Sequence, residues 1–320
     1  MNPYIEMWLK VIDGMNNDNT YKLAWGRAIV EICHFSTIND KSDLEIHFDE
    51  ISEYFLKYFW NQTYLFKLYQ GPAKSKPRIQ QITEDMILEY QKKSESKLPV
   101  WFDIAKPVLL GDTEWYSKMI KRISSAIKVD VCWRFTKVGK DDIQLYKLDR
   151  EYKVLTLTKD QVEIIRDHAF VLSQLLNYRW AQLLEKFNSS PRIAMKVKGI
   201  SEESIRRSSL SKFKQVLLTQ FQDGKVTDFY SGELLDSNDI RIDHVIPWSF
   251  MYSDDIWNLV ITSKSHNSRK SNTQVGEDVI QKLKERNSVL IEIVPENYRN
   301  DIISSIELRL LEKFYFQFKL

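Results

Sequence analysis

The sequence is poor in glycine. Only 9 of its 320 residues are glycine, well below the ~7% that is usual for proteins. No G-x-G-x-x-G, Walker A or G-x-S-x-G pattern occurs. The sequence therefore gives no support for a dinucleotide-binding fold, a phosphate-binding P-loop or a hydrolase nucleophile elbow.

Cysteine is also scarce, and long apolar runs are missing. Cys33 and Cys132 are the two cysteines, too few for a disulfide framework or a four-cysteine zinc site, and free thiols are typical of a reducing compartment. The N-terminal residues lack the basic and apolar regions of a secretory signal. No stretch reaches the length of a membrane span. We therefore expect a soluble, cytoplasmic protein with no membrane partner.

An excess of charge of one sign is absent as well. Lys and Arg number 46 against 44 Asp and Glu, which gives a net charge of +2. This balance excludes a protein that binds nucleic acid through its bulk charge, so any such site must be a local patch. The 43% of hydrophobic residues is enough for one large core or two modest ones.

The pattern of apolar residues predicts a mainly helical first region. Steps of three and four predict a long helix over 160–187, and Thr158 with Gln161 has the spacing of a capping box. Short apolar runs predict strands near 131–135 and 152–155. The segment 188–191, Asn-Ser-Ser-Pro, has the composition of a linker. We expect a helical recognition or regulatory domain over 1–189 and a second domain over 190–320.

The second domain begins with a basic stretch. Its cations between positions 192 and 214 are Arg192, Lys196, Lys198, Arg206, Arg207, Lys212 and Lys214, against two acidic residues. Such a stretch is ordinarily a solvent-exposed helix face. Its position directly before the motif described next favours a phosphate-binding surface instead, with Arg206 and Arg207 as candidate contacts.

The motif lies in residues 240–272. Ile240 and Ile242 predict a short strand that ends at Asp243 and His244, and residues 259–261 predict a second strand. A polar turn at 263–265 leads into a predicted helix that starts with His266 and Asn267. Two strands and a helix would gather Asp243, His244, Asn258 and Asn267 around one small cleft.

These residue types suit the hydrolysis of a phosphodiester bond. Mg²⁺ prefers oxygen ligands and often takes only one or two from the protein, which Asp243 and the amide oxygen of Asn267 can supply. His244 is a candidate general base, because neutral imidazole accepts a proton from water near neutral pH. A bound cation would stabilise negative charge on the phosphate.

The ordered set Asp243-His244-Val245-Ile246-Pro247, Asn258-Leu259-Val260 and Asn267 with Lys270-Ser271 resembles the HNH (ββα-metal) endonuclease family. It is similar to the HNH domains of CRISPR nucleases and of small bacterial and phage enzymes, over about residues 222–272. The resemblance implies that Asp243 and Asn267 are metal ligands. It also implies two catalytic residues, His244 as the general base and Asn258 as the residue that braces the loop and orients the base. The sequence is the H-N-N variant.

Two features depart from the family pattern. The positions where many members carry Cys-x-x-Cys pairs read Asp228 to Ser231 and Ser263 to His266. Without thiolates we expect no structural zinc, and a domain held by ordinary packing. His266 is an alternative final metal ligand in a shifted register, although Lys270 and Ser271 are in register with Asn267.

The sequence thus predicts an α+β protein, a mainly helical region followed by a ββα-metal nuclease domain without a zinc knuckle. We expect an endonuclease that depends on Mg²⁺ or Mn²⁺ and acts on DNA, with RNA as an alternative substrate.

Bacterial restriction or anti-phage defence is the expected setting by analogy. Arg269 and Lys270 are further candidate phosphate contacts, and the N-terminal domain is a candidate site for a protein partner. The alternative is a nuclease-fold subunit that binds nucleic acid or a partner without cutting.

Overall fold

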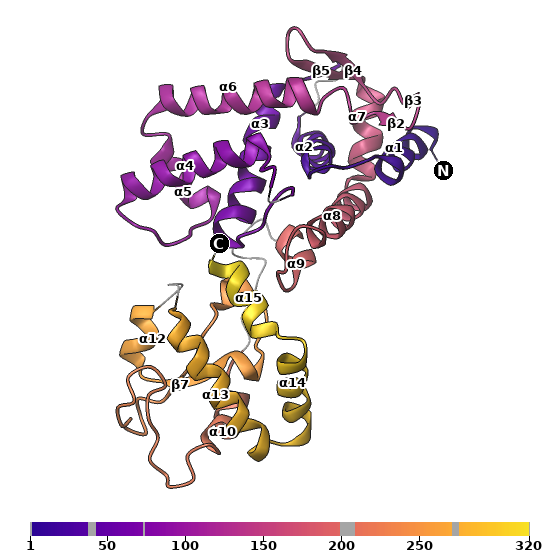
Figure 1. Cartoon of the computed structure of the whole chain (residues 1–320). Coiled ribbons are helices and arrows are strands. Elements are labelled where there is room, and N and C mark those ends of the chain that lie inside the picture. Colours follow the sequence, from indigo (N-terminus) through magenta and orange to yellow (C-terminus); the bar gives the residue numbers. More distant parts are fainter. Residues whose placement is uncertain (1, 38–42, 73, 199–208, 271–274, 320) are drawn as a thin grey trace. The chain divides into compact units, whose positions relative to one another are not determined.

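The computed structural model describes residues 2–37, 43–72, 74–198, 209–270 and 275–319. The chain divides into two compact units (Figure 1). Among the described residues, unit 1 comprises 2–188 and 193–198, and unit 2 comprises 189–192 and the residues from 209 onward. No described helix combines the length and the apolar character that crossing a bilayer requires.

Unit 1 is mainly helical, as the sequence predicts. Its helices are α1 (Pro3–Gly14), α2 (Tyr21–Phe35), α3 (Phe48–Trp60), α4 (Arg78–Ser94), α5 (Phe102–Leu109), α6 (Thr113–Asp130), α7 (Lys159–Asp167), α8 (Ala169–Glu185) and α9 (Ile193–Lys198), with a π-helical turn η1 (Asn61–Leu65). Helix α3 packs against α6, and α2 packs against α8. Figure 1 shows α6 running alongside α4 within this unit.

Short strands complete unit 1. They are β1 (Leu44–His47), β2 (Lys137–Val138), β3 (Asp141–Asp142), β4 (Lys147–Asp149) and β5 (Val154–Leu157). Strand β5 lies between β1 and β4 in an antiparallel sheet, and β2 pairs with β3 as a small hairpin. This sheet joins a strand that precedes α3 to strands that follow α6, so it ties distant parts of the unit together.

The core of unit 1 is rich in aromatic side chains. Trp8, Trp25, Trp60 and Trp180 are all fully buried, and large rings of this kind contribute much of the apolar area that a core removes from water. Gly26 in α2 allows close packing, because an added Cβ would lie 2.8 Å from the ring of Phe135.

A buried cation is held inside this core. Arg27 is 1% exposed, and its Nε pairs with Glu31 at 2.7 Å. Its guanidinium also lies 4.5 Å from the centre of the Tyr58 ring and donates to the carbonyl of Val197 in α9. A buried charge is tolerated only when it is paired and hydrogen-bonded, so these contacts explain how the core accommodates it.

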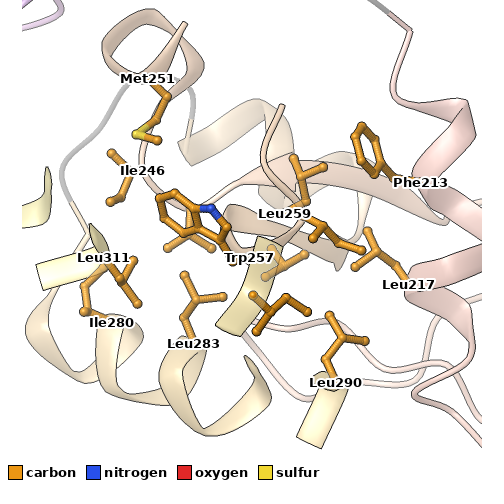
Figure 2. Close-up of a cluster of buried hydrophobic side chains, with 14 of the residues drawn as sticks. Phe213, Leu217, Ile246, Met251, Trp257, Leu259, Ile280, Leu283, Leu290 and Leu311 are labelled. Carbon is orange, nitrogen blue, oxygen red and sulfur yellow. The ribbon is translucent and has the colours of Figure 1, made fainter. Parts of the chain in front are cut away.

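Unit 2 holds a two-stranded sheet and a set of helices. Its elements are α10 (Ser211–Leu218), β6 (Arg241–His244), α11 (Trp248–Met251), a 3₁₀ turn η3 (Ile256–Asn258), β7 (Leu259–Thr262), α12 (Lys264–Lys270), α13 (Glu277–Ile293), α14 (Glu296–Glu307) and α15 (Leu310–Lys319). Figure 2 shows Trp257 among the apolar side chains of the core, which include Ile246, Leu259 and Leu283.

Several sequence predictions for secondary structure are confirmed. Strands β5, β6 and β7 lie where the apolar runs predict them, and Thr158 and Gln161 exchange both hydrogen bonds of a capping box. The observed mixture of a helical first region with small sheets matches the predicted α+β class. Helix α12 begins at Lys264, two residues before the predicted start.

Four predictions of secondary structure are wrong, two in unit 1 and two in unit 2. The predicted strand at 131–135 is instead a series of turns after α6. The long helix predicted over 160–187 is interrupted at His168, where the backbone leaves the helical region and the ring Nδ1 lies 2.9 Å from the carbonyl oxygen of Ile164. Neither a glycine nor a proline marks this break, and the pattern of apolar residues continues across it.

In unit 2, the sequence predicts a strand over 289–294, but α13 continues to Ile293 and Val294 caps it. Leu290 takes its place on the same buried face as Leu283, so packing overrides the strand preference of the β-branched residues. The helix predicted over 296–318 is broken between Glu307 and Leu310. Arg309 there has a φ of 52°, which a continuous helix does not permit.

Candidate functional site

The candidate site is built on β6, β7 and α12, the ββα arrangement that the motif predicts. Strand β6 pairs antiparallel with β7, with Asp243 opposite Val260 and His244 opposite Leu259. Helix α12 follows β7 after one residue and packs against β6. The residues at the end of β6 and the residues of α12 are therefore held on neighbouring elements.

Asp243 lies at the end of β6 and is 9% exposed. The hydroxyl of Tyr230 donates to Oδ2 of Asp243 across 2.6 Å. Burial, reinforced by the negative charge of Asp243, raises the pKa of Tyr230 well above its usual range. Tyr230 therefore stays protonated at neutral pH and acts as a donor that fixes the carboxylate.

His244 is also 9% exposed and contacts a carboxylate. Its Nε2 lies 3.0 Å from Oδ1 of Asp254, and the two side chains are 11% and 15% exposed. Such a contact fixes both the orientation and the tautomer of an imidazole. The pair therefore gives His244 one defined pose beside Asp243.

Asn258 is fully buried and clamps the loop that follows His244. Its Oδ1 accepts from the N–H of Ile246 and its Nδ2 donates to the carbonyl of the same residue, both at 2.8 Å. The N–H of Val245 also donates to the backbone carbonyl of Asn258 at 2.9 Å. Asn258 thus positions the segment after the histidine rather than facing solvent.

Asn267 lies in α12, and its side chain is half-buried. Its backbone N–H donates to the carbonyl of Ser263 across 3.0 Å, which starts the helix. Because α12 packs on β6, the helix that carries Asn267 lies against the strand that carries Asp243.

Asp228 is the centre of a hydrogen-bond network beside these residues. Its Oδ1 accepts from the N–H groups of Tyr230 and Ser231, and its Oδ2 accepts from the Thr262 hydroxyl and the Ser263 N–H. Nδ1 of His266 lies 2.9 Å from the same Oδ2. The network ties the turn at 228–231 to the start of α12.

The electrostatics of Asp228 reflect this environment. Burial alone raises the pKa of its carboxyl, but the hydrogen bonds from Ser263, Ser231, Thr262 and His266 outweigh it and hold the pKa well below its usual range. Asp228 is therefore a charged acceptor at neutral pH. Charge-assisted hydrogen bonds of this kind are stronger than neutral ones.

A buried arginine lies next to the network. Nε and Nη1 of Arg286 are buried and have no hydrogen-bond partner among the described residues, while Nη2 donates to the carbonyl of Trp257 at 3.3 Å. Burial lowers the pKa of Arg286 to about 9. Together with Asp228, Phe229 and Lys282 it lines a cavity of about 320 Å³.

The donor set limits which cation fits the site. Within the described ranges no group of three or more His, Cys, Asp or Glu side chains is arranged to hold a metal. Asp243 and Asn267 offer one carboxylate and one carboxamide, which are oxygen ligands. Mg²⁺ and Mn²⁺ suit oxygen ligands and retain several waters, so these two residues fit a hydrated hard cation.

Not every predicted site residue can be located. Arg206 and Arg207 lie outside the described residues, as do the side chains of Arg269 and Lys270, which belong to α12. The prediction of a basic surface is wrong at Lys196. The side chain of Lys196 is fully buried, and burial lowers its pKa well below the usual range. It therefore does not face solvent with the other cations.

Sequence reasoning missed three residues that the structure brings to the site. Asp254 pairs with His244, Tyr230 fixes Asp243, and Asp228 holds the start of α12. Asp254 lies ten residues after His244 inside the motif, but the neighbouring carboxylate of Asp255 is equally close in sequence. Tyr230 has the residue type of an ordinary packing aromatic. Nothing in the spacing distinguishes these partners before the loop is folded.

Comparison with known proteins gives the site a family. The family described as HNH endonuclease matches residues 228–275. The chain is also 27% identical over 188 residues to the CRISPR-associated endonuclease Cas9 of Streptococcus mutans serotype c. That similarity covers 57% of this chain but only 13% of the Cas9 chain, so it spans a small part of that relative. No solved structure matches the chain. Residues 228–275 therefore belong to an HNH-type domain, and the described part of this segment contains the Asp228 turn, β6, β7 and α12.

Proposed function

We propose that this protein is a divalent-metal-dependent endonuclease that hydrolyses phosphodiester bonds in DNA. The observation that carries the proposal is the position of Asp243 and His244, which are adjacent at the end of β6 and next to α12. Asn258 clamps the backbone of the segment that follows them. A carboxylate that can hold a cation and an imidazole that can take a proton from water suit the metal-assisted hydrolysis of a phosphodiester, and buried contacts hold both side chains here.

Asp243 and Asn267 would hold the cation through their oxygen atoms. Tyr230 supports this role, because its hydrogen bond to Oδ2 restricts the rotation of the Asp243 carboxylate. When bound, Mg²⁺ or Mn²⁺ would supply positive charge that stabilises the phosphate oxygens and the leaving oxygen. We favour Asn267 over His266, since Nδ1 of His266 already contacts Asp228 and Ser263.

His244 would act as the general base. With Nε2 held by Asp254, a tautomer that donates from Nε2 leaves the lone pair on Nδ1 to accept a proton from water. The water oxygen then forms a bond to phosphorus while the bond from phosphorus to the leaving oxygen breaks. The leaving oxygen takes up a proton from solvent, and His244 later releases its own.

The remaining site residues would orient the reacting groups or bind the substrate. Asn258 positions the segment after His244 and does not itself touch the substrate, because it is fully buried. Arg269, Lys270, Arg206 and Arg207 are proposed as phosphate contacts from their place in the sequence. Phosphate contacts of this kind give affinity and register without reading bases.

We further propose that the domain has no structural zinc. The positions that carry cysteine pairs in many family members hold Asp228, Ser231, Ser263 and His266 here, and these residues are joined by hydrogen bonds. The Asp228 network links the same two segments that a zinc ion would link. It therefore offers the stabilisation that the metal would otherwise provide.

The proposed setting is bacterial restriction or anti-phage defence in the cytoplasm, with unit 1 as the part that recognises a site or a protein partner. The similarity to a CRISPR-associated endonuclease supports this setting. Protection can be measured directly as the plating efficiency of phages on bacteria that carry the gene or its His244→Ala variant. Equal plating on both strains would remove the defence role without affecting the nuclease assignment.

Metal removal and restoration test the catalytic proposal. The purified protein is incubated with supercoiled plasmid, linear duplex, single-stranded DNA and RNA, in Mg²⁺, in Mn²⁺ and in excess chelator. We expect nicked or linear DNA only with metal, and recovery when metal is returned after chelation. Intact nucleic acids under every condition, with DNA binding preserved, would instead support a subunit that binds without cutting.

A further inference from the structure

We propose that unit 1 carries a second nucleic-acid contact, a surface on α6 that binds the phosphate backbone of double-stranded DNA. We define the α6 basic face by Arg78, Lys118, Lys121, Arg122, Lys128 and Arg150. The choice of DNA as the ligand rests on the proposed function, but the surface itself lies outside the HNH-type domain.

The distribution of charge along α6 is the first observation. Four cations, Lys118, Lys121, Arg122 and Lys128, fall between residues 115 and 129, and no acidic residue falls among them. Their spacing of three, one and six residues places them along one side of the helix. The opposite side is apolar and buried, with Met119, Ile123 and Ile127 in the core of unit 1.

Three of these cations line an open hollow. It has a volume of about 580 Å³, and Arg78, Lys118, Lys121 and Arg122 line it with Asp130 as the single acidic residue. Oδ1 of Asp130 already lies 3.9 Å from Nη1 of Arg134, and Nη2 of Arg122 lies 3.3 Å from Oδ2 of Asp85. Lys118 and Lys121 are both exposed. The hollow is therefore a concentration of positive charge on a protein whose net charge is close to neutral.

The positive surface extends past the end of α6. Nη2 of Arg150 donates to the carbonyl of Lys128, and Nζ of Lys153 donates to the hydroxyl of Ser125. These contacts bring two cations from the β4–β5 region onto the C-terminal half of the helix. A cation at a helix C-terminus also offsets the negative end of the helix dipole.

An aromatic ring holds further cations at this end. The guanidinium groups of Arg134 and Arg150 lie 4.7 and 5.7 Å from the centre of the Trp133 ring, and Nζ of Lys137 lies 4.9 Å away. The indole N–H of Trp133 donates to the carbonyl of Val129 across 2.9 Å. Trp133 is therefore anchored to the end of α6 and serves to arrange the cations.

The geometry fits the backbone of a duplex better than other anionic partners. Lys118 and Lys128 are separated by about 15 Å along the helix axis, which spans about four phosphates of one DNA strand. Arg134, Lys137 and Arg150 all lie over the ring of Trp133, so an unpaired base that stacked on this ring would have to displace cations. The apolar side of α6 is buried, so it cannot insert into a lipid surface.

Binding of a fluorescent duplex of about 25 base pairs tests the proposal. The whole 320-residue chain is used, in excess chelator so that cleavage cannot occur. The variant combines Lys118→Glu with Lys121→Glu. We expect an affinity loss of about 30-fold at ~0.15 M salt, and a plot of log K against log salt whose slope is shallower by about 2, since each phosphate contact contributes ~0.9. A companion variant with both residues changed to arginine should bind like the wild type.

The matched control combines Lys97→Glu with Lys186→Glu, two exposed lysines outside the α6 basic face. It changes the net charge equally and should leave both affinity and slope within about twofold of the wild type. Thermal unfolding confirms that each variant is folded. An unchanged affinity in the α6 variant, or an equal loss in the control, would overturn the proposal.

Single-stranded RNA and anionic phospholipid vesicles serve as the other arms of the experiment. A loss confined to either of them, with duplex binding unchanged, would also overturn the assignment to DNA. Because chelator is present throughout, an inactive nuclease centre does not affect this measurement. Failure here and failure of the catalytic proposal are therefore distinguishable.

Discussion

The HNH-type domain and the α6 basic face use polar and charged side chains in opposite ways. In the domain, Asp243, His244 and Asn258 are buried and each is held by a specific hydrogen bond. On α6, Lys118 and Lys121 are exposed on a regular helix. Catalysis requires groups fixed in one pose, whereas attraction of a polyanion requires only a local density of charge. The two regions should therefore respond differently to substitution.

The largest expected effect is on the rate of cleavage in the His244→Ala variant. Removing a general base lowers the rate by about 10²–10⁴-fold, while the affinity for duplex DNA in chelator stays within about twofold of the wild type. The initial rate of plasmid nicking and a binding titration measure the two quantities. The exposed His47 provides a matched control as His47→Ala. Undiminished nicking by His244→Ala would refute the assigned base.

The next effect is on stability in Asn258→Ala. The change leaves the buried N–H and carbonyl of Ile246 without their partners, and each unsatisfied group costs about 1–3 kcal/mol. We expect the free energy of unfolding to fall by about 2–4 kcal/mol, measured by urea titration. Asn300→Ala on the exposed face of α14 is the control and should change stability by less than about 0.5 kcal/mol. Equal stabilities would contradict the clamp.

A smaller effect on cleavage is expected for Asp254→Asn. The variant loses the carboxylate that orients His244, so the turnover rate should fall about 10- to 100-fold with little change in KM. Asp255→Asn alters the adjacent carboxylate, which bonds to Ser253 instead, and should retain most of the activity. If both variants lost activity equally, Asp254 would have no special positioning role.

The smallest effect concerns pH. Because the pKa of Asp228 is depressed in the folded protein, its contribution to stability is fully present above the unfolded value of about 3.9 and is lost as pH falls toward the folded value. Wild type should therefore exceed Asp228→Asn in stability at pH 6 by more than at pH 3. Asp301→Asn, at an exposed site, should show no such convergence.

Elemental analysis complements this measurement. Purified protein should contain zinc well below one equivalent, and chelation should leave the melting temperature unchanged if the Asp228 network holds the domain. A stoichiometric zinc ion whose removal unfolds the domain would contradict that proposal.

The local signals in the sequence were the most predictable. The strands β6 and β7 are short apolar runs, and Thr158 with Gln161 makes a cap from residues three positions apart. Helix breaks without local signals were not predictable. His168 and Arg309 interrupt helices although no glycine or proline lies at either place.

The partners of the site residues were harder still to predict. Asp254 and Asp255 are equivalent in sequence, yet His244 contacts only the first in the folded loop. Lys196 reads as one more cation in a basic stretch, but α9 packs against α8 and buries it. Such pairings depend on the path of the chain, which neither periodicity nor composition records.

The sequence by itself determined which chemical groups are present and in what order: a carboxylate and an imidazole side by side, two carboxamides downstream, and a row of lysines spaced for one side of a helix. Tertiary structure alone decided that Tyr230 fixes Asp243, that Asp254 orients His244, and that cations from the β4–β5 region join those of α6. The reason is physical, since a spacing rule describes neighbours along one element, whereas these contacts form between elements brought together when apolar surface is buried.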